Sequence, residues 1–298
     1  MVGVTASDDS SRLEPCRGCQ AMRHDQRVNR QHDYLLDNKD AAAGARLAAL
    51  AEVFDPVTFR HLDSLGIAPG CCCWEVGAGA PTVPRWLGGR VGAQGRVLAT
   101  DIDVGRISEP ILQVEVRRHD VGRDDPPAEY FDLVHARLVL VHVVQRQRAL
   151  RVMIESLKPG GWLLLEDADP DLQPLASPDE SGPEQLLANR VRHAFRLLMR
   201  QRGVDLAYGR TLPRLFREAG LAEVQADAYF PITGPACAAL ERATVEQIGG
   251  QLVTAGLCSA LEVSQHLANL AAGGLDLATA PLVSAWGRRP YPRGRPVV

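Results

Sequence analysis

The sequence predicts an α/β fold in which helices cover both faces of an open, doubly wound, mostly parallel β-sheet. Short runs of strand length are apolar almost throughout, which is typical of strands buried on both faces. Single stretches long enough for one helix separate most of these runs, as in successive βαβ units. Glycine, proline and aspartate gather at the junctions, where turns are expected.

The first part of the chain supplies two predicted helices and two strands. Residues 1–30 are polar and are expected to be loose. From Tyr34 to Leu65 apolar residues recur at helical spacing, and the interruption at Asp55-Pro56 predicts two helices rather than one. The elements that follow are a turn at 66–70, a strand at 71–76, a helix at 84–91 and a strand at 96–102.

The remainder of the chain continues the alternation and then becomes more helical. The next predicted elements are strands at 114–120 and 131–136, a helix at 146–157, a turn at 158–161 and a strand at 162–167. Beyond them we expect helices at 184–202 and 212–219, a strand at 223–229, a helical stretch at 236–270 and a last strand at 282–287. Residues 169–183 are rich in Pro, Asp and Ser and are expected to form a loop.

The composition of the chain limits the kinds of molecule that it is expected to bind. The chain has 298 residues, of which 46% are hydrophobic and 23% charged, as in an ordinary globular protein. Its net charge of −3 disfavours nucleic acid, which usually demands a basic surface. No apolar run is long enough to cross a membrane, and the first thirty residues lack a signal-peptide core. We therefore expect a cytoplasmic protein that binds neither nucleic acid nor a membrane.

The seven cysteines predict neither a disulfide framework nor a metal site. Cys71, Cys72 and Cys73 are adjacent on a predicted buried strand. Cys16 and Cys19 form a CxxC pair, but no second pair with suitable spacing completes a zinc site. We expect no metal, and a reduced N-terminal segment.

Acidic residues and glycines follow the first predicted strands, at the edge where parallel sheets bind ligands. Glu75 is followed by Gly77-Ala78-Gly79, in which glycine lets the backbone turn sharply and approach a ligand. Asp101 closes the second strand, about twenty residues later, at the separation expected for a carboxylate that binds ribose hydroxyls. Asp120 closes the third strand and is placed to accept from an adenine amino group.

The glycine pattern is not that of a dinucleotide or of a triphosphate. A GxGxxG fingerprint would need glycine at Thr82, which argues against NAD. The chain also lacks a GxxxxGK[ST] loop in this region. A nucleoside without phosphates agrees with both observations.

The motifs, taken in order, resemble a known family. EVGAG, VLATDID, HDV, FDLVHARLVLVH and LKPGGWLLLED are similar to the motifs of class I S-adenosylmethionine-dependent methyltransferases, particularly bacterial members that modify small molecules. YGRTLPRLFREAGL and SAWGRR extend the resemblance over roughly residues 30–290. It implies a Rossmann-like sheet of seven strands with an antiparallel last strand, a helical lid, and S-adenosyl-L-methionine as cofactor.

Composition at the two ends and the resemblance between them together predict a domain organisation. Residues 1–30 would be a flexible segment, and 31–288 the methyltransferase domain. Within that domain, 31–65 would form N-terminal helices, and 169–205 and 236–275 would be lid insertions. Residues 289–298 would be a basic tail.

The same resemblance assigns the cofactor-binding residues. The loop with Glu75, Gly77, Ala78 and Gly79 would bind the methionine end of the cofactor. The others would be Asp101 at the ribose, Ile102 against the adenine, Asp120 and Val121 at the adenine edge, and Arg137 beside the cofactor after the fourth strand. Pro81 stands where the family pattern has glycine, and a proline fits there if it lies in the first helical turn.

Several of these side chains have alternative roles. Asp103 is an alternative to Asp101 as the ribose-binding acid, although it more naturally caps the following segment. Arg137 can form an ion pair with a nearby acid instead of binding the cofactor. His142 is the candidate general base because imidazole titrates near neutrality; a structural role is the alternative. His135, inside a strand, is expected to be a hydrogen-bonded core residue. Three carboxylates after the fifth strand are expected to be solvated or to bind substrate: Glu166, Asp167 and Asp169.

These patterns predict a methyltransferase that acts on a small molecule, such as an acceptor of secondary metabolism. The accepting atom, oxygen, nitrogen or carbon, stays open. One alternative keeps the cofactor but catalyses a different reaction such as a cyclisation; another is a non-enzymatic protein with a degenerate cleft. The stretch 236–270 can cover the substrate, form a homodimer interface or simply pack into the core.

Overall fold

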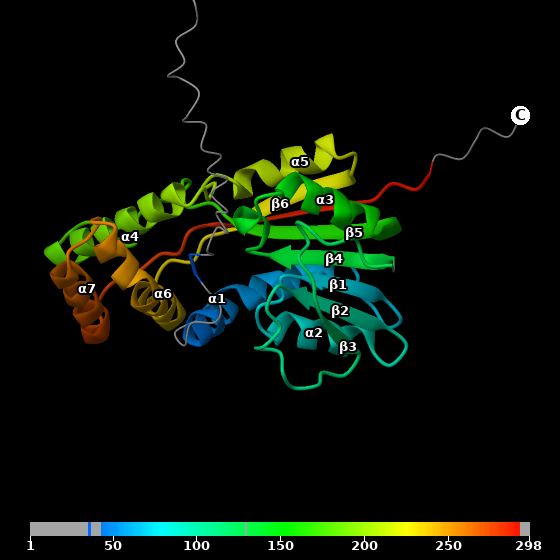
Figure 1. Cartoon of the computed structure of the whole chain (residues 1–298), viewed down its shortest axis with the longest axis horizontal. Coiled ribbons are helices and arrows are strands. Elements are labelled where there is room, and N and C mark those ends of the chain that lie inside the picture. The colour runs from blue at the N-terminus through cyan, green and yellow to red at the C-terminus, as the bar shows by residue number, and fades with distance from the viewer. Residues whose placement is uncertain (1–34, 37–42, 129, 293–298) are drawn as a thin grey trace, which may run out of the picture. The chain divides into compact units, whose positions relative to one another are not determined.

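Among the residues that the structure describes, one sheet has seven strands. Figure 1 shows how they are arranged in the computed structural model. The structure describes residues 35–36, 43–128 and 130–292. The strands are β1 (Cys72–Val76), β2 (Arg96–Asp101), β3 (Val114–Arg118), β4 (Phe131–Arg137), β5 (Leu157–Ala168), β6 (Ala222–Tyr229) and β7 (Leu282–Arg288). Their order is β3-β2-β1-β4-β5-β7-β6.

Strand direction confirms the predicted fold class. The neighbours among β1 to β5 all pair in parallel. β7 lies between β5 and β6 and is antiparallel to both. The chain order reverses at β1, which has β2 on one side and β4 on the other. Ligands bind beyond the carboxyl ends of the strands at such a point.

Helices cover both faces of the sheet (Figure 1). Helices α3 (Arg146–Glu155) and α5 (Leu212–Glu218) pack on one face, in a core that includes Trp74, Phe131 and Phe216. Helices α1 (Ala43–Ser64) and α2 (Thr82–Val91) pack on the other, in a core with Leu62, Leu87 and Leu164. Burial of these side chains from water is the main stabilising contribution to the sheet.

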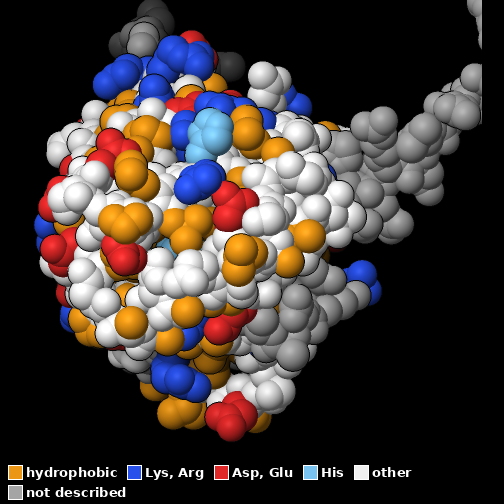
Figure 2. Space-filling view, turned by 90° about the vertical axis from the view of Figure 1, so that its left-hand side faces the viewer, with side chains coloured by type: hydrophobic (Ala, Val, Ile, Leu, Met, Phe, Trp, Pro, Cys, Tyr) orange, Lys and Arg blue, Asp and Glu red, His pale blue; other side chains and the backbone are white. Residues whose placement is uncertain are grey.

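Three further helices form a layer beside the sheet. They are α4 (Pro183–Gln201), α6 (Pro235–Thr254) and α7 (Ala260–Ala272), and two short 3₁₀ segments are η1 (Leu140–His142) and η2 (Gly209–Thr211). Val191, Ile248 and Leu252 are among the side chains that join α4 to α6. Figure 2 shows this side of the molecule, where hydrophobic side chains are scattered among charged ones.

The predicted break in the first helical region is wrong, because α1 continues through Asp55-Pro56. A proline inside a helix removes one backbone hydrogen bond, so tertiary contacts must hold both halves. Before the proline, Val53 and Phe54 pack beside α6 and β7. After it, Phe59 and Leu62 pack on the sheet.

The predicted turn at 158–161 is also wrong, since these residues are part of β5. Gly160 has a φ of +81°, which lets the strand bend there, and β4 changes register between Phe131 and Leu133. The Gly160 N–H donates to the Arg289 carbonyl at 2.7 Å, so the pairing extends into the first residue of the expected basic tail.

The predicted helical stretch 236–270 consists of two helices rather than one. α6 ends at Thr254, and Ser259 starts α7 with a capping box in which Glu262 is the reciprocal partner. No helix in the described part of the chain is long and apolar enough to span a membrane. Within the same residues no group of three potential ligands could hold a metal, and the Cys16–Cys19 pair lies outside them.

Candidate functional site

The loop after β1 turns through two glycines with left-handed backbone conformation. Gly77 has a φ of +65° and Gly79 a φ of +56°. The Ala78 N–H donates to the Thr100 carbonyl at 2.9 Å, which holds the loop against β2. A Cβ at Gly77 would lie 2.3 Å from the side chain of Val139, just after β4, so no larger residue fits there without movement.

Asp101 connects β2 to this loop. Its Oδ2 accepts from the Gly79 N–H at 2.9 Å, and its Oδ1 accepts from the Asp103 N–H at the same distance. Burial raises the pKa of Asp101, while the backbone hydrogen bonds lower it. The two loops beyond β1 and β2 are therefore tied together at one carboxylate.

Asp103 and Ile102 complete this strand end. Asp103 accepts from the Gly105 N–H at 3.0 Å and so organises the local turn, the role expected for it. Ile102 is 57% exposed, an apolar side chain left open to solvent beside the end of β2.

Asp120 and Val121 follow β3. Asp120 is half-buried, and its Oδ1 accepts from the Gly122 N–H at 2.9 Å. Nε of Arg123 lies 3.6 Å from its Oδ2. Val121 is buried in the core on the α3 side. Asp120 thus closes a turn and keeps part of its carboxylate accessible.

Pro81 is accommodated at the start of α2. It is the N-cap residue, with φ −78° and ψ −4°, and its carbonyl accepts from the Arg85 N–H at 2.9 Å. Its missing N–H would have had no partner within the helix. The departure from the family pattern therefore leaves the loop and helix intact.

Glu75 points into the core on the α1 face. It is 2% exposed, and its Oε2 lies 2.5 Å from Nδ1 of His135 on the neighbouring strand β4. His135 is fully buried, and its Nε2 lies 3.4 Å from Oε2 of Glu166 on β5. The prediction of a hydrogen-bonded core histidine at position 135 is confirmed.

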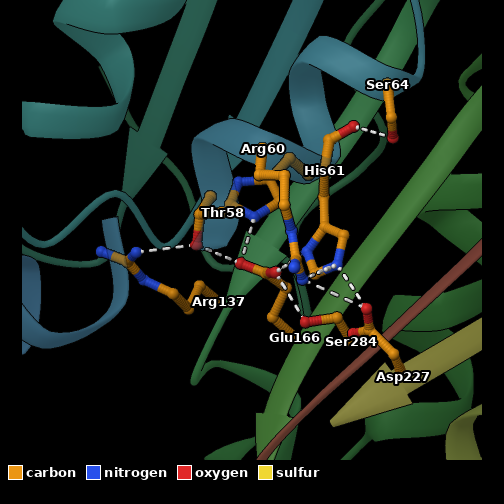
Figure 3. A network of polar contacts seen from close by, with 9 residues as sticks. Thr58, Arg60, His61, Ser64, Arg137, Glu166, Asp227 and Ser284 are labelled. Atoms are coloured by element: carbon orange, nitrogen blue, oxygen red, sulfur yellow. Dashed lines mark hydrogen bonds and ion pairs between the residues drawn. The ribbon is translucent and has the colours of Figure 1, made fainter. Parts of the chain in front are cut away.

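Glu166 is the centre of a buried polar network (Figure 3). Its Oε1 accepts from Ser284 Oγ at 2.7 Å and lies 3.0 Å from Nδ1 of His61. Thr58 donates its hydroxyl to Oε2 of the same carboxylate. Burial alone would raise the pKa of Glu166, but hydrogen bonds from His135 and His61 hold it well below its usual range.

Arg137 at the end of β4 is anchored to α1. Its guanidinium donates to Thr58 Oγ1 at 2.9 Å and to Asp55 Oδ1 at 2.7 Å. Both members of the Arg137–Asp55 pair are largely buried. The ion-pair alternative for Arg137 is therefore present, with a partner on α1 rather than at a strand end.

His142 lies in η1 and is half-buried. Burial, and then the positive charges of Arg46 and Arg146, lower its pKa to about 4. The imidazole is therefore neutral near pH 7 but only weakly basic.

The three carboxylates associated with β5 are buried rather than solvated, contrary to the simplest expectation. Glu166 and Asp167 point to opposite sides of the sheet because they are successive strand residues, and Asp169 lies just beyond the end of β5. Glu166 joins the network above, and Asp169 accepts from Arg210 Nε at 2.6 Å. Burial raises the pKa of Asp167 to about 8, although the Val141 and Leu140 backbone N–H groups lower it.

Sequence reasoning missed the contributions of Thr58, His61, Asp227 and Ser284. The signal for the first two is their i, i+3 spacing on one helix, which places both polar groups on one face. A cavity of about 280 Å³ lies elsewhere, at the start of β2 and β3, and no predicted site residue lines it.

A family model described as a methyltransferase domain matches residues 22–226. The match covers more than half of the chain. The chain belongs to this methyltransferase family. The resemblance to class I S-adenosylmethionine-dependent methyltransferases is thereby confirmed, and S-adenosyl-L-methionine is the cofactor of the family.

Two curated relatives agree with this membership. The methyltransferase str2 of Strobilurus tenacellus is 34% identical over 144 residues, which are 43% of this chain and 52% of that protein. The ubiquinone/menaquinone biosynthesis C-methyltransferase UbiE of Bordetella parapertussis is 32% identical over 117 residues, 37% of this chain and 45% of that protein. The chain thus spans about half the length of these curated relatives.

The methyltransferase fold is also that of the YcgJ protein of Bacillus subtilis. Its structure superimposes with a TM-score of 0.50 and 14% identity, over 78% of this chain and 97% of that one. At this level of identity the likeness concerns the fold alone.

Proposed function

We propose that the protein transfers a methyl group from S-adenosyl-L-methionine to a small molecule, within a domain of residues 31–288. The observation that carries the proposal is the hydrogen bond from the Gly79 N–H to Asp101 at 2.9 Å. It brings a glycine turn and a strand-end carboxylate together where the strand order reverses. A carboxylate has about four acceptor sites, so Asp101 keeps capacity for ribose hydroxyls after accepting two N–H groups.

The residues around the hydrogen bond between Gly79 and Asp101 fit the cofactor. Gly79 is open enough that an added Cβ would meet only ordinary contacts, the nearest at 3.6 Å. Gly77, Ala78 and Gly79 would bind the methionine end through their backbone, with Glu75 behind them. Ile102 offers an exposed apolar surface to the adenine, and Asp120 with Val121 would form the edge beside it. Arg137 would stand next to the cofactor while anchored on Asp55.

The cofactor supplies a methyl group on a positively charged sulfur, and the protein's task is to align the acceptor with it. His142 is the proposed base where the acceptor must lose a proton. Its pKa of about 4 suits an acceptor that is already nucleophilic or acidic, and not an ordinary alcohol. An amine, which attacks before it loses a proton, or an acceptor acidic enough to be ionised near pH 7 fits this limit.

The name of one relative supports a small-molecule acceptor, since UbiE is a C-methyltransferase of ubiquinone and menaquinone biosynthesis. We propose that α4, α6 and α7 form the substrate lid. We also propose that the acceptor belongs to secondary metabolism. The cytoplasm is the proposed compartment, in agreement with the free thiols of the described cysteines. A homodimer is proposed as the assembly, and nucleic acid and membranes are not proposed as partners.

Calorimetric titration with S-adenosylmethionine, S-adenosylhomocysteine and NAD tests the cofactor assignment. We expect micromolar binding of both sulfur nucleosides and none of NAD. Asp101→Asn should weaken binding roughly tenfold or more, because a charged acceptor is lost. Failure of the unmodified protein to bind either nucleoside would overturn the proposal.

A pair of glycine variants provides the matched control. Gly77→Ala forces a side chain into a positive φ and against Val139, and should abolish binding. Gly89→Ala lies in α2 with nothing within 4 Å of the new Cβ, and should leave binding unchanged. Equal effects of the two would show that the loop after β1 is not the binding element.

A further inference from the structure

Acids and histidines alternate in a buried line across the sheet, on the face covered by α1. We call this line the acid–histidine ladder; its members are Glu75, His135, Glu166, His61 and Asp227. It starts directly before the glycine loop and ends at the edge strand β6, where the Asp227 side chain is 42% exposed. Figure 3 shows the part around Glu166.

Strand register places the ladder on one face. Glu75 pairs with His135 between β1 and β4, and Glu166 pairs with Ser284 between β5 and β7. Ser284 in turn pairs with Asp227 on β6. Directly paired residues point to the same side of a sheet, and α1 supplies His61 from the layer above.

Every ring nitrogen in the ladder faces a carboxylate. His135 has Nδ1 at 2.5 Å from Glu75 and Nε2 at 3.4 Å from Glu166. His61 has Nδ1 at 3.0 Å from Glu166 and Nε2 at 3.1 Å from Asp227. Ionised carboxylates only accept hydrogen bonds, so both nitrogens of each ring must carry a proton. With all three acids ionised, only two imidazolium cations satisfy this geometry.

The other groups around the ladder agree with this charge pattern. Nη2 of Arg60 lies 3.4 Å from Nε2 of His61 but 3.2 Å from Oδ2 of Asp227, so both cations donate to that carboxylate. Arg137 faces Glu166 through Thr58, and Ser284 donates to Glu166 from β7. The Trp286 ring stacks at a tilt beside His61 and contributes no charge.

The pKa shifts point the same way. Burial alone would lower the pKa of His135, but the charge of Glu75 and hydrogen bonds to Glu166 and Glu75 raise it to about 9. Burial likewise opposes the charge of His61, and the hydrogen bonds to Glu166 and Asp227 nevertheless raise its pKa.

We propose that His135 and His61 are positioning residues which, as imidazolium cations, fix the end of β1 and the cofactor loop relative to the rest of the sheet. The inference rests on the proposed cofactor site. Glu75 precedes Gly77 by two residues, and Gly77 packs against Val139, two residues beyond the end of β4. The Glu75–His135 contact sets the β1–β4 alignment on which that close packing depends.

The protonation state is measured first, on the unmodified protein, by ¹⁵N NMR of the histidine rings. We expect His135 to retain both ring protons at about pH 8, and His61 to lose a ring proton at a higher pH than an ordinary imidazole, whose pKa is about 6.5. The signals are assigned by their loss in His135→Gln and His61→Gln. A neutral His135 ring at that pH would overturn the proposal, and this result needs no variant to bind cofactor.

The positioning role is measured by the affinity for S-adenosylhomocysteine as a function of pH. His135→Gln should bind roughly tenfold more weakly than the unmodified protein near pH 7, and the ratio should shrink as pH passes about 9 and the native ring loses its proton. Taking the ratio at each pH removes the titration of the ligand's own amino group. His193→Gln, at an exposed position on α4, is the matched control and should bind normally.

Two further outcomes would count against the positioning role of His135 and His61. A ratio that stays constant with pH would indicate a merely structural role for His135 and overturn the proposal. Charged rings in a protein that binds no nucleoside would show that the ladder exists but that the proposed function, and with it the positioning role, is wrong. If His135→Gln does not fold, the same ratio is measured with His61→Gln, and it should likewise shrink as rising pH removes the proton from the native His61 ring.

Discussion

The two faces of the sheet are each covered by two helices but differ in what they bury. On the α3 and α5 face the strands contribute an apolar core, with residues such as Trp74, Val134 and Leu165. On the α1 and α2 face a line of charged groups crosses the sheet between apolar residues. The comparison is sharpest at Glu166 and Asp167, adjacent acids that point to opposite faces.

The difference shows two ways of burying a carboxylate. Glu166 is ionised and its charge is compensated by two histidines, a serine and a threonine. Asp167 has no cationic hydrogen-bond partner, its Oδ1 is without a partner among the described residues, and its pKa of about 8 leaves it mostly neutral near pH 7. Buried charges are tolerated when each has a partner, so the ladder should be sensitive to the loss of any member.

Glu166→Gln is expected to have the largest effect. The substitution keeps the side-chain size but leaves His135 and His61 without a shared counter-charge in the core. We expect the free energy of unfolding to fall by about 3–5 kcal/mol, measured by urea denaturation. Leu165→Met, a similarly conservative change on the opposite face, should cost less than about 1.5 kcal/mol. Comparable losses would mean that packing, and not charge, dominates on the α1 face.

The dependence of stability on pH should come next. His135 has a folded-state pKa of about 9, above its unfolded value of 6.5, so its stabilising contribution is complete below about pH 6.5. That contribution is lost as pH rises through about 9, and His61 shifts in the same direction. We expect His135 to account for a decrease of about 3 kcal/mol in the free energy of unfolding across this window, measured as the difference between the unmodified protein and His135→Gln so that the titration of Asp167 cancels. A difference that is flat there would contradict charged histidines in the ladder.

Asp167→Asn should change the free energy of unfolding in the opposite direction from Glu166→Gln. Since Asp167 is protonated when folded and ionised when unfolded, it destabilises the fold increasingly as pH rises from about 4 to about 8. A neutral amide removes this effect, and we expect a gain of up to about 4 kcal/mol near pH 7 that disappears near pH 4. Destabilisation at both pH values would show that Asp167 is needed as a carboxyl group.

The sequence predicted the fold and the strand-end acids because both depend on short-range patterns. Asp101 could be placed by its distance from Gly77 and Gly79, and the structure indeed joins it to Gly79. The break at Pro56 was wrongly predicted because the local rule for proline omits packing on both halves of α1.

The ladder could not be predicted in the same way. His61 and Glu166 are 105 residues apart, and no local sequence pattern in α1 or β5 indicates that the two side chains meet. Glu75 looked like a ligand-facing acid from its motif, whereas strand register turns it toward His135. Burial and register, which arise only from the assembled sheet, decide these partners.

Asp227→Asn tests whether the ladder reaches the edge of the sheet, and its effect on stability should be the smallest. The side chain is partly exposed, so the loss should be within about 1 kcal/mol. Asp63→Asn is the control. Asp63 lies on α1, the helix that carries His61, and forms an exposed ion pair with Arg90. Neither change creates a cavity.

The two variants should nevertheless separate in the NMR titration of His61. Removing the Asp227 charge and hydrogen bond should lower the pKa of His61, while Glu166 still keeps it above that of a buried, unpaired imidazole. Asp63→Asn should leave the pKa of His61 unchanged. If both variants leave it unchanged, the charge-coupled part of the α1 face ends at Glu166, and the contrast between the two faces is confined to the centre of the sheet.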